Sequence, residues 1–211
     1  MKPYWFSLFL VSFFSGNYYA QFTTYRPPVS YHPTAVVISK QALEFFPLGS
    51  LSQLKGAKQV NIQYDYKSVQ VEGFKTEEEF LERKKSKYAN SGNPEKGDDF
   101  VNNWYTSRET VCEPKYELLF NKYSKFVTGV NYSKENEITV IVKPKFFQPG
   151  FMGPATKPTY MTFSVIFYNK NFEEFFRYNI SGVKGTSFCN CVEMAGKVVG
   201  KRLSKDLKNL H

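Results

Sequence analysis

Three runs with the periodicity of β-strands, at residues 137–147, 159–168 and 174–180, stand directly before one amphipathic helical run at 186–208. The first run is rich in β-branched residues, and the third is rich in aromatic residues. Only a short polar segment beginning at Asn169 separates the second and third runs, which predicts a hairpin. Strands so close in sequence pair with one another, and the helix needs a sheet to bury its apolar stripe. That stripe consists of Phe188, Val192, Ala195, Val199 and Leu203.

The first half of the chain predicts two more strands and then helices. Short apolar or alternating runs at 35–39 and 58–66 are typical of strands. Thr76 followed three residues later by Glu79 is the signature of a helix start, because each side chain can bond the other residue's backbone amide. Helical spacing resumes near residue 99 and continues beyond Pro114, which predicts two helices or one helix kinked at that proline.

This order of elements predicts an α+β fold: a mostly antiparallel sheet of about five strands, covered on one face by two to three helices. The chain has 211 residues, of which 42% are hydrophobic and 18% aromatic. That length and composition suit one well-formed core. We expect a single domain over 35–211.

The first twenty residues have the layout of a secretory signal peptide. Lys2 precedes an apolar run, and the small residue Ala20 stands before Gln21. The apolar run is too short to span a membrane as a helix, which needs roughly 20 apolar residues. We expect removal of residues 1–20 and export to the periplasm or cell envelope, with no membrane-spanning segment left. Tyr18 is unusual for a cleavage site, so an uncleaved anchor is the alternative.

Between this segment and the domain, residues 21–34 carry three prolines and show no periodicity, which predicts an extended leader. The chain as a whole is basic, with a net charge of +9 at pH 7. For an exported protein this charge favours an anionic envelope lipid or glycan, or an envelope protein, as the partner, and no nucleic acid is expected. The residues that would form such a surface share one side of the last helix: Lys197, Lys201, Lys205 and Lys208. The alternative is that this side is simply solvated.

Three cysteines raise the question of a metal or a disulfide. Cys189 and Cys191 lie about 160° apart on a helix, so one metal ion could not bind both. Zinc also prefers four ligands, and the two histidines, His32 and His211, are near the termini. We therefore predict no metal and no cofactor. In an exported protein one disulfide is expected, between Cys112 and either Cys191 or Cys189, while Cys191 is alternatively a small buried apolar residue.

Motifs of common enzymes are missing from the sequence. It contains no nucleophile elbow, no zinc-protease motif, no phosphate-binding glycine loop and no dinucleotide fingerprint. The carboxylate clusters at 77–79, 98–99 and 173–174 could supply a glycosidase pair, but each falls at a helix start or a hairpin, where acidic residues are common. Aromatic residues in the loop 146–158 could stack on a sugar or a protein partner, or cover the core edge.

Several segments together carry a family resemblance. They are YYAQ at the end of the signal segment, VQVEGFKTEEEFLERK, the PGF loop and the terminal AGKVVGKRLSKDLKNL. In these the chain resembles a group of exported α+β proteins of Bacteroidetes-type bacteria to which no activity is assigned. More loosely, helices packed on one sheet are similar to small envelope-assembly modules such as the lipopolysaccharide-assembly lipoprotein.

Two hypotheses for function follow from these patterns. The first is a non-catalytic exported binding or scaffold module that acts through its basic helix and aromatic loop. The second is a carboxylate-based hydrolase acting on envelope or dietary glycan. An enzyme would require two facing carboxylates in a concave pocket, whereas a binding module would present dispersed acidic residues and an exposed basic or aromatic patch.

Overall fold

A computed structural model of the protein describes residues 42–125, 128–130, 133, 136–150 and 157–210. The chain divides into two units after Ala35, and the described residues all belong to the second unit. The signal segment, the leader and the strand expected at 35–39 lie outside the described residues, as does part of the loop 146–158.

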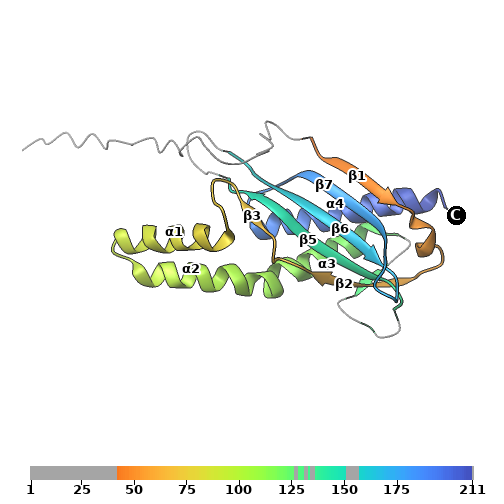
Figure 1. Cartoon of the computed structure of the whole chain (residues 1–211), viewed down its shortest axis with the longest axis horizontal. Helices are drawn as coiled ribbons and strands as arrows, with labels where there is room; N and C mark the ends of the chain where they lie inside the picture. Colours follow the sequence, from red (N-terminus) through yellow and green to blue (C-terminus); the bar gives the residue numbers. More distant parts are fainter. Residues whose placement is uncertain (1–41, 126–127, 131–132, 134–135, 151–156, 211) are drawn as a thin grey trace, which may run out of the picture. The chain divides into compact units, whose positions relative to one another are not determined.

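Within the described residues the chain forms one sheet of seven strands (Figure 1). The strand order is β1-β7-β6-β5-β2-β4, and β3 pairs with β5 beyond the end of β2. The strands are β1 (Glu44–Gly49), β2 (Gln59–Tyr64), β3 (Gln70–Val71), β4 (Thr128–Val130), β5 (Thr139–Gln148), β6 (Thr159–Tyr168) and β7 (Glu174–Gly185).

The sheet is mixed, so the expectation of about five mostly antiparallel strands is wrong. Strands β5, β6, β7 and β1 pair antiparallel in succession, whereas β2, β3 and β4 all run parallel to their partners. The physical reason lies in the helices between β3 and β4, because a chain that crosses over through helices returns to the same end of the sheet and pairs parallel. The predicted hairpin of β6 and β7 is confirmed.

The described residues form four α-helices, which agrees with two separate helices on either side of Pro114, although only two to three helices were expected to cover the sheet. They combine with the sheet into the predicted α+β class. A 3-10 helix, η1 (Leu51–Leu54), follows β1, and a π-helical turn, η2 (Arg108–Cys112), joins two of the α-helices without a break. The α-helices are α1 (Glu77–Asn90), α2 (Pro94–Ser107), α3 (Glu113–Tyr123) and α4 (Phe188–Lys208).

Local signals locate the helix starts well. Thr76 caps α1, and its side chain accepts a hydrogen bond from the Glu79 amide at 3.2 Å. The Glu79 carboxylate accepts from the backbone of Lys75 rather than that of Thr76. Pro114 is the second residue of α3, directly after the π-helical turn, and it has no amide hydrogen to donate to the preceding turn. No helix in the described part of the chain is long and apolar enough to cross a membrane.

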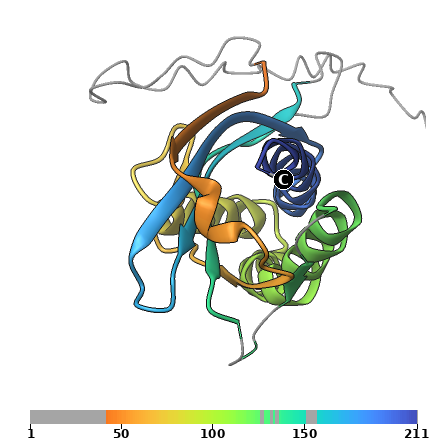
Figure 2. The same ribbon diagram turned by 90° about the vertical axis from the view of Figure 1, so that its right-hand side faces the viewer.

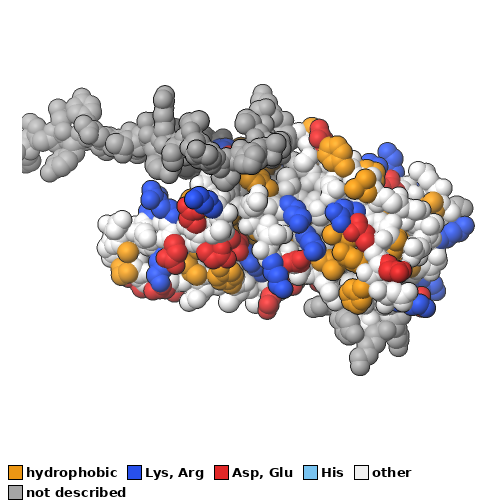
Figure 3. Space-filling view, viewed as in Figure 1, with side chains coloured by type: hydrophobic (Ala, Val, Ile, Leu, Met, Phe, Trp, Pro, Cys, Tyr) orange, Lys and Arg blue, Asp and Glu red, His pale blue; other side chains and the backbone are white. Residues whose placement is uncertain are grey.

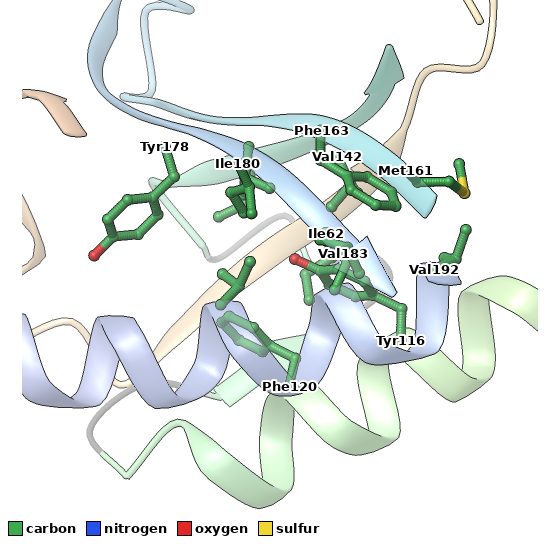
Figure 4. Packing of buried hydrophobic residues seen from close by; sticks show 14 of the residues in the cluster. Ile62, Tyr116, Phe120, Val142, Met161, Phe163, Tyr178, Ile180, Val183 and Val192 are labelled. Carbon is green, nitrogen blue, oxygen red and sulfur yellow. The ribbon is translucent and has the colours of Figure 1, made fainter. Parts of the chain in front are cut away.

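Helices α3 and α4 lie side by side on one face of the sheet (Figure 2). Their backbones approach closely because Gly196 and Gly200 have no side chain, and a Cβ on Gly200 would lie 2.7 Å from the carbonyl oxygen of Phe120. The core between these helices and the sheet is rich in aromatic residues (Figure 4). It includes Ile62, Val142, Phe163, Tyr178 and Ile180 from strands, and Tyr116, Phe120 and Val192 from helices.

Candidate functional site

The lysines predicted on α4 lie opposite its buried stripe, as the helical periodicity requires. Lys201, Lys205 and Lys208 are exposed, and Lys197 is half-buried. None of the four forms an ion pair with a residue that the structure describes. The nearby Asp206 does not pair with these lysines, because its carboxylate accepts hydrogen bonds from Arg202 and from Tyr178 on the sheet side. The basic face, defined as these four lysines, is therefore not neutralised by its own helix.

A tyrosine on α3 extends the basic face beyond α4. The Nζ atoms of Lys197 and Lys201 lie 5.8 Å and 4.9 Å from the centre of the Tyr123 ring, and that of Lys122 lies 5.7 Å away. The aromatic ring attracts these ammonium groups through its quadrupole without cancelling their charge. On α3 Leu118 is 67% exposed, and Lys115, three residues earlier, is also exposed.

The surface of the α1 and α2 helices differs from the basic face because it carries charges of both signs. Figure 3 shows acidic and basic side chains interspersed over these two helices. One pair there is Lys85 with Asp98, whose charged atoms are 2.7 Å apart. A mixed face of this kind attracts neither anions nor cations over distance, so the basic face stands out by its single sign.

The disulfide joins Cys112 to Cys189, so the pairing of Cys112 with Cys191 is wrong. Cys189 lies on the flank of α4 that meets η2, whereas Cys191 lies on the stripe that packs into the core and is fully buried. Because the two cysteines lie on different sides of α4, as predicted, only Cys189 is placed to pair with Cys112. Burial raises the pKa of the Cys191 thiol to about 12, so this cysteine behaves as a small apolar residue.

A second site, which the sequence patterns did not reveal, is a pocket of about 590 Å³ beside the start of α1. Its floor holds an ion pair between Glu77 of α1 and Arg108 at the start of η2, and both side chains are 9% exposed. The Trp104 indole nitrogen donates a hydrogen bond of 2.9 Å to the Glu77 carboxylate. The carboxylate is thus held from two directions.

Aromatic rings surround the Arg108 guanidinium group. Its central carbon lies 4.6 Å from the centre of the Tyr66 ring, 5.2 Å from Tyr105 and 5.5 Å from Phe188. A guanidinium group is weakly hydrated and stacks on aromatic faces, which makes arginine the cation best suited to such a place. No sequence pattern announces this cluster, because its members come from a loop, two helices and a π-turn. The π-turn itself is a type of irregularity that is frequent at functional sites.

Each of the carboxylate clusters considered for hydrolysis has at least one member in a structural contact. Glu77 pairs with Arg108, Glu79 caps α1, Asp98 pairs with Lys85, and Glu174 binds Arg177 through two hydrogen bonds. Different carboxylates are perturbed instead. Burial raises the pKa of Glu113 on α3 to about 7 and also raises the pKa of Glu117 one turn later. Neither of these α3 residues lines the 590 Å³ pocket.

Comparison with known proteins does not assign the chain to a family. No family model and no curated protein sequence matches the chain. Two solved structures of PelC dodecamers from Paraburkholderia phytofirmans, one of them a point variant, are similar to it in part. The variant has a TM-score of 0.40 and 6% identity, covering 79% of this chain and 97% of that one. The other has a TM-score of 0.39 and 7% identity, covering 77% and 98%. A likeness this distant has no bearing on function.

Proposed function

We propose that the protein is a non-catalytic, exported binding module of the cell envelope, which docks on an anionic lipid surface through the basic face of α4. The observation that carries the proposal is that Lys197, Lys201, Lys205 and Lys208 form one row without ion-pair partners among the described residues. Export itself is supported by the layout of residues 1–20.

The geometry of the row favours a flat array of charges as its partner. Eleven residues of helix separate the first and last lysine, so the row extends over about 16 Å. Each lysine close to an anionic membrane surface contributes about 1 kcal/mol, which gives about 4 kcal/mol for the row. The exposed Leu118 on the adjacent α3 provides an apolar side chain for the headgroup region.

Sedimentation with lipid vesicles tests the proposal. The protein is expected to pellet with vesicles containing phosphatidylglycerol, to stay in solution with pure phosphatidylcholine, and to be released by high salt. The double variant Lys201→Glu/Lys205→Glu is expected to lose most of this binding. Lys87→Glu/Lys96→Glu, which changes the net charge equally at exposed lysines of α1 and α2, is expected to bind as the unchanged protein does.

Three outcomes would contradict the proposal. Equal losses in the two double variants would show that net charge alone determines retention. Binding to neutral vesicles would show that charge is not the attraction. Retention on an acidic glycan or on a protein, with none on anionic vesicles, would assign the basic face to a different partner.

The alternative function, a carboxylate-based hydrolase, is favoured by one observation. Glu113 has a pKa of about 7, which is the range of a general acid that works near neutral pH. The position of Glu113 outside the 590 Å³ pocket argues against it. Reducing-end release from a panel of polysaccharides tests this function, with Glu113→Gln as the variant that should abolish any release.

A further inference from the structure

The 590 Å³ pocket lies at a different part of the domain from the basic face, and none of the four α4 lysines lines it. The loop from β2 to β3 and the first turn of α1 form two of its walls, and the junction of α2 with η2 forms the third. Its volume falls in the range typical of small-molecule sites, about 300–1,000 Å³. Its lining is about equally polar and apolar, which favours a ligand that carries both kinds of surface.

Charge in the pocket favours an anion. Lys67 and Lys75 line it, and neither forms an ion pair with a residue in the described part of the chain. The two carboxylates present are Glu77 and Glu78, and that of Glu77 is already neutralised by Arg108. Among the groups that line the pocket, two unpaired ammonium groups therefore outnumber one exposed carboxylate.

An aromatic ring gives the pocket a flat wall. The Tyr105 side chain is 42% exposed, and its inner side is covered by the Arg108 guanidinium group at 5.2 Å. This stacking fixes the orientation of the ring while leaving area free for a ligand. An exposed aromatic face held in place suits the apolar C–H face of a sugar ring, and the neighbouring polar groups suit its hydroxyls.

Arg108 also carries an unused donor. Its side chain is more than nine-tenths buried, and its Nε atom has no hydrogen-bond partner among the described residues. A buried donor without an acceptor costs free energy, commonly about 1–3 kcal/mol. This atom is not solvent-accessible, so the unmet donor belongs to the buried floor and not to the surface that a ligand would contact.

From these observations we propose that the pocket binds one acidic sugar unit of a glycan. The acidic group lies between Lys67 and Lys75, the sugar ring stacks on Tyr105, and hydroxyls donate hydrogen bonds to the Glu78 carboxylate. An inorganic anion would use only the lysines, and a neutral sugar would leave them without a partner. This site is independent of lipid docking by α4.

Fluorescence titration of Trp104 measures binding directly, because this residue bonds the floor carboxylate and contacts Arg108. The sequence has one other tryptophan, Trp5, so a Trp5→Phe background leaves a single reporter. Digalacturonate is expected to give a saturable change. Galactobiose, the uncharged analogue, is expected to bind at least about tenfold more weakly, since a charge-assisted hydrogen bond is lost.

Variants separate this site from the rest of the surface. Lys67→Glu/Lys75→Glu and Tyr105→Ala are each expected to weaken digalacturonate binding about tenfold or more. The lysines are exposed, whereas Tyr105→Ala also removes a ring from Arg108, so its fold is checked by circular dichroism. The matched control Lys55→Glu/Lys58→Glu is expected to bind normally, as is Lys201→Glu/Lys205→Glu, which loses vesicle binding only. Three results would overturn the proposal: equal affinity for both disaccharides, equally strong binding of inorganic sulfate, or no saturable change.

Discussion

Among single residues, Arg108 needs the most from its neighbours, because its positive charge is buried. A buried charge is tolerated only where a partner and hydrogen bonds replace the water it has lost. Glu77 supplies the opposite charge, and Tyr66, Tyr105 and Phe188 supply the aromatic faces. Apart from Phe188, these residues also line the pocket of the proposed sugar site, so one cluster both holds Arg108 and shapes that pocket.

Removal of the Glu77 carboxylate is expected to destabilise the fold strongly. Glu77→Ala leaves the Arg108 cation buried without its partner, which typically costs about 3–5 kcal/mol. Urea denaturation followed by circular dichroism measures the change. Glu82→Ala, at an exposed position of the same helix, serves as the control and is expected to change stability by less than about 0.5 kcal/mol. Equal effects of the two substitutions would show that the pair contributes nothing.

Glu113 predicts a dependence of stability on pH. Burial raises its pKa in the folded protein from 4.5 to about 7, so the folded state binds the proton more tightly than the unfolded state does. Its contribution is therefore fully present below pH 4.5 and is lost as the pH rises through about 7. Glu113→Gln, which stays neutral, is expected to gain stability relative to the unchanged protein above pH 7, and denaturation midpoints at pH 4 and pH 8 measure this. A difference that does not change with pH would contradict the assignment.

At the scale of elements, the joint between the second and third helices is fixed by a covalent bond. The α2, η2 and α3 segments run on without a break, and the disulfide from Cys112 in η2 to Cys189 in α4 ties the π-turn to the last helix. The bond connects residues 77 apart in sequence. Closing a loop of this length lowers the conformational entropy of the unfolded chain, and this raises the free energy of unfolding.

Loss of this bond is expected to lower the free energy of unfolding by about 2–4 kcal/mol in Cys112→Ser/Cys189→Ser. Thermal denaturation of the oxidised protein and the variant measures the loss. Cys191→Ala is the control for pairing: a non-reducing peptide map should still show the peptides of Cys112 and Cys189 joined. A joined pair containing Cys191 in the unchanged protein would contradict the structure.

Sequence patterns predict elements well where their signals are local. Strands β5, β6 and β7 and the helices α1 and α4 lie within a few residues of their predicted positions, because caps and periodicity act over one or two turns. Strand β1 has no such signal, since its sequence EFFPLG has no alternation and contains Pro47. It forms at the edge of the sheet through pairing with β7, a partner more than a hundred residues away.

At the scale of the whole molecule, two unlike surfaces are presented by one fold. The α4 lysines lie on one exposed side because the opposite side of that helix fills the core. The pocket arises where α1 and the π-turn meet the loop after β2. If both proposals hold, the protein docks on an anionic membrane with one surface and holds an acidic glycan with the other.

Export predicts a change in the mature chain. Protein recovered from the periplasm or envelope fraction of its native cells is expected to begin at Gln21, as measured by intact-mass spectrometry. Ala20→Glu is expected to block cleavage, because a charged residue replaces the small one at the cleavage site. Recovery of the full-length chain from the cytoplasm would contradict export, and an uncleaved chain in the membrane fraction would support the anchor instead.

The amphipathic last helix with its lysine row and the separation of Cys189 from Cys191 follow from periodicity along one segment, and the α+β class follows from the order of such segments. The parallel pairing of β2 with β5, the partner of Cys112 and the pocket around Arg108 became known only from the folded chain. These depend on which distant segments meet in the folded chain, and no local pattern encodes such a meeting because it is selected by packing of the whole core.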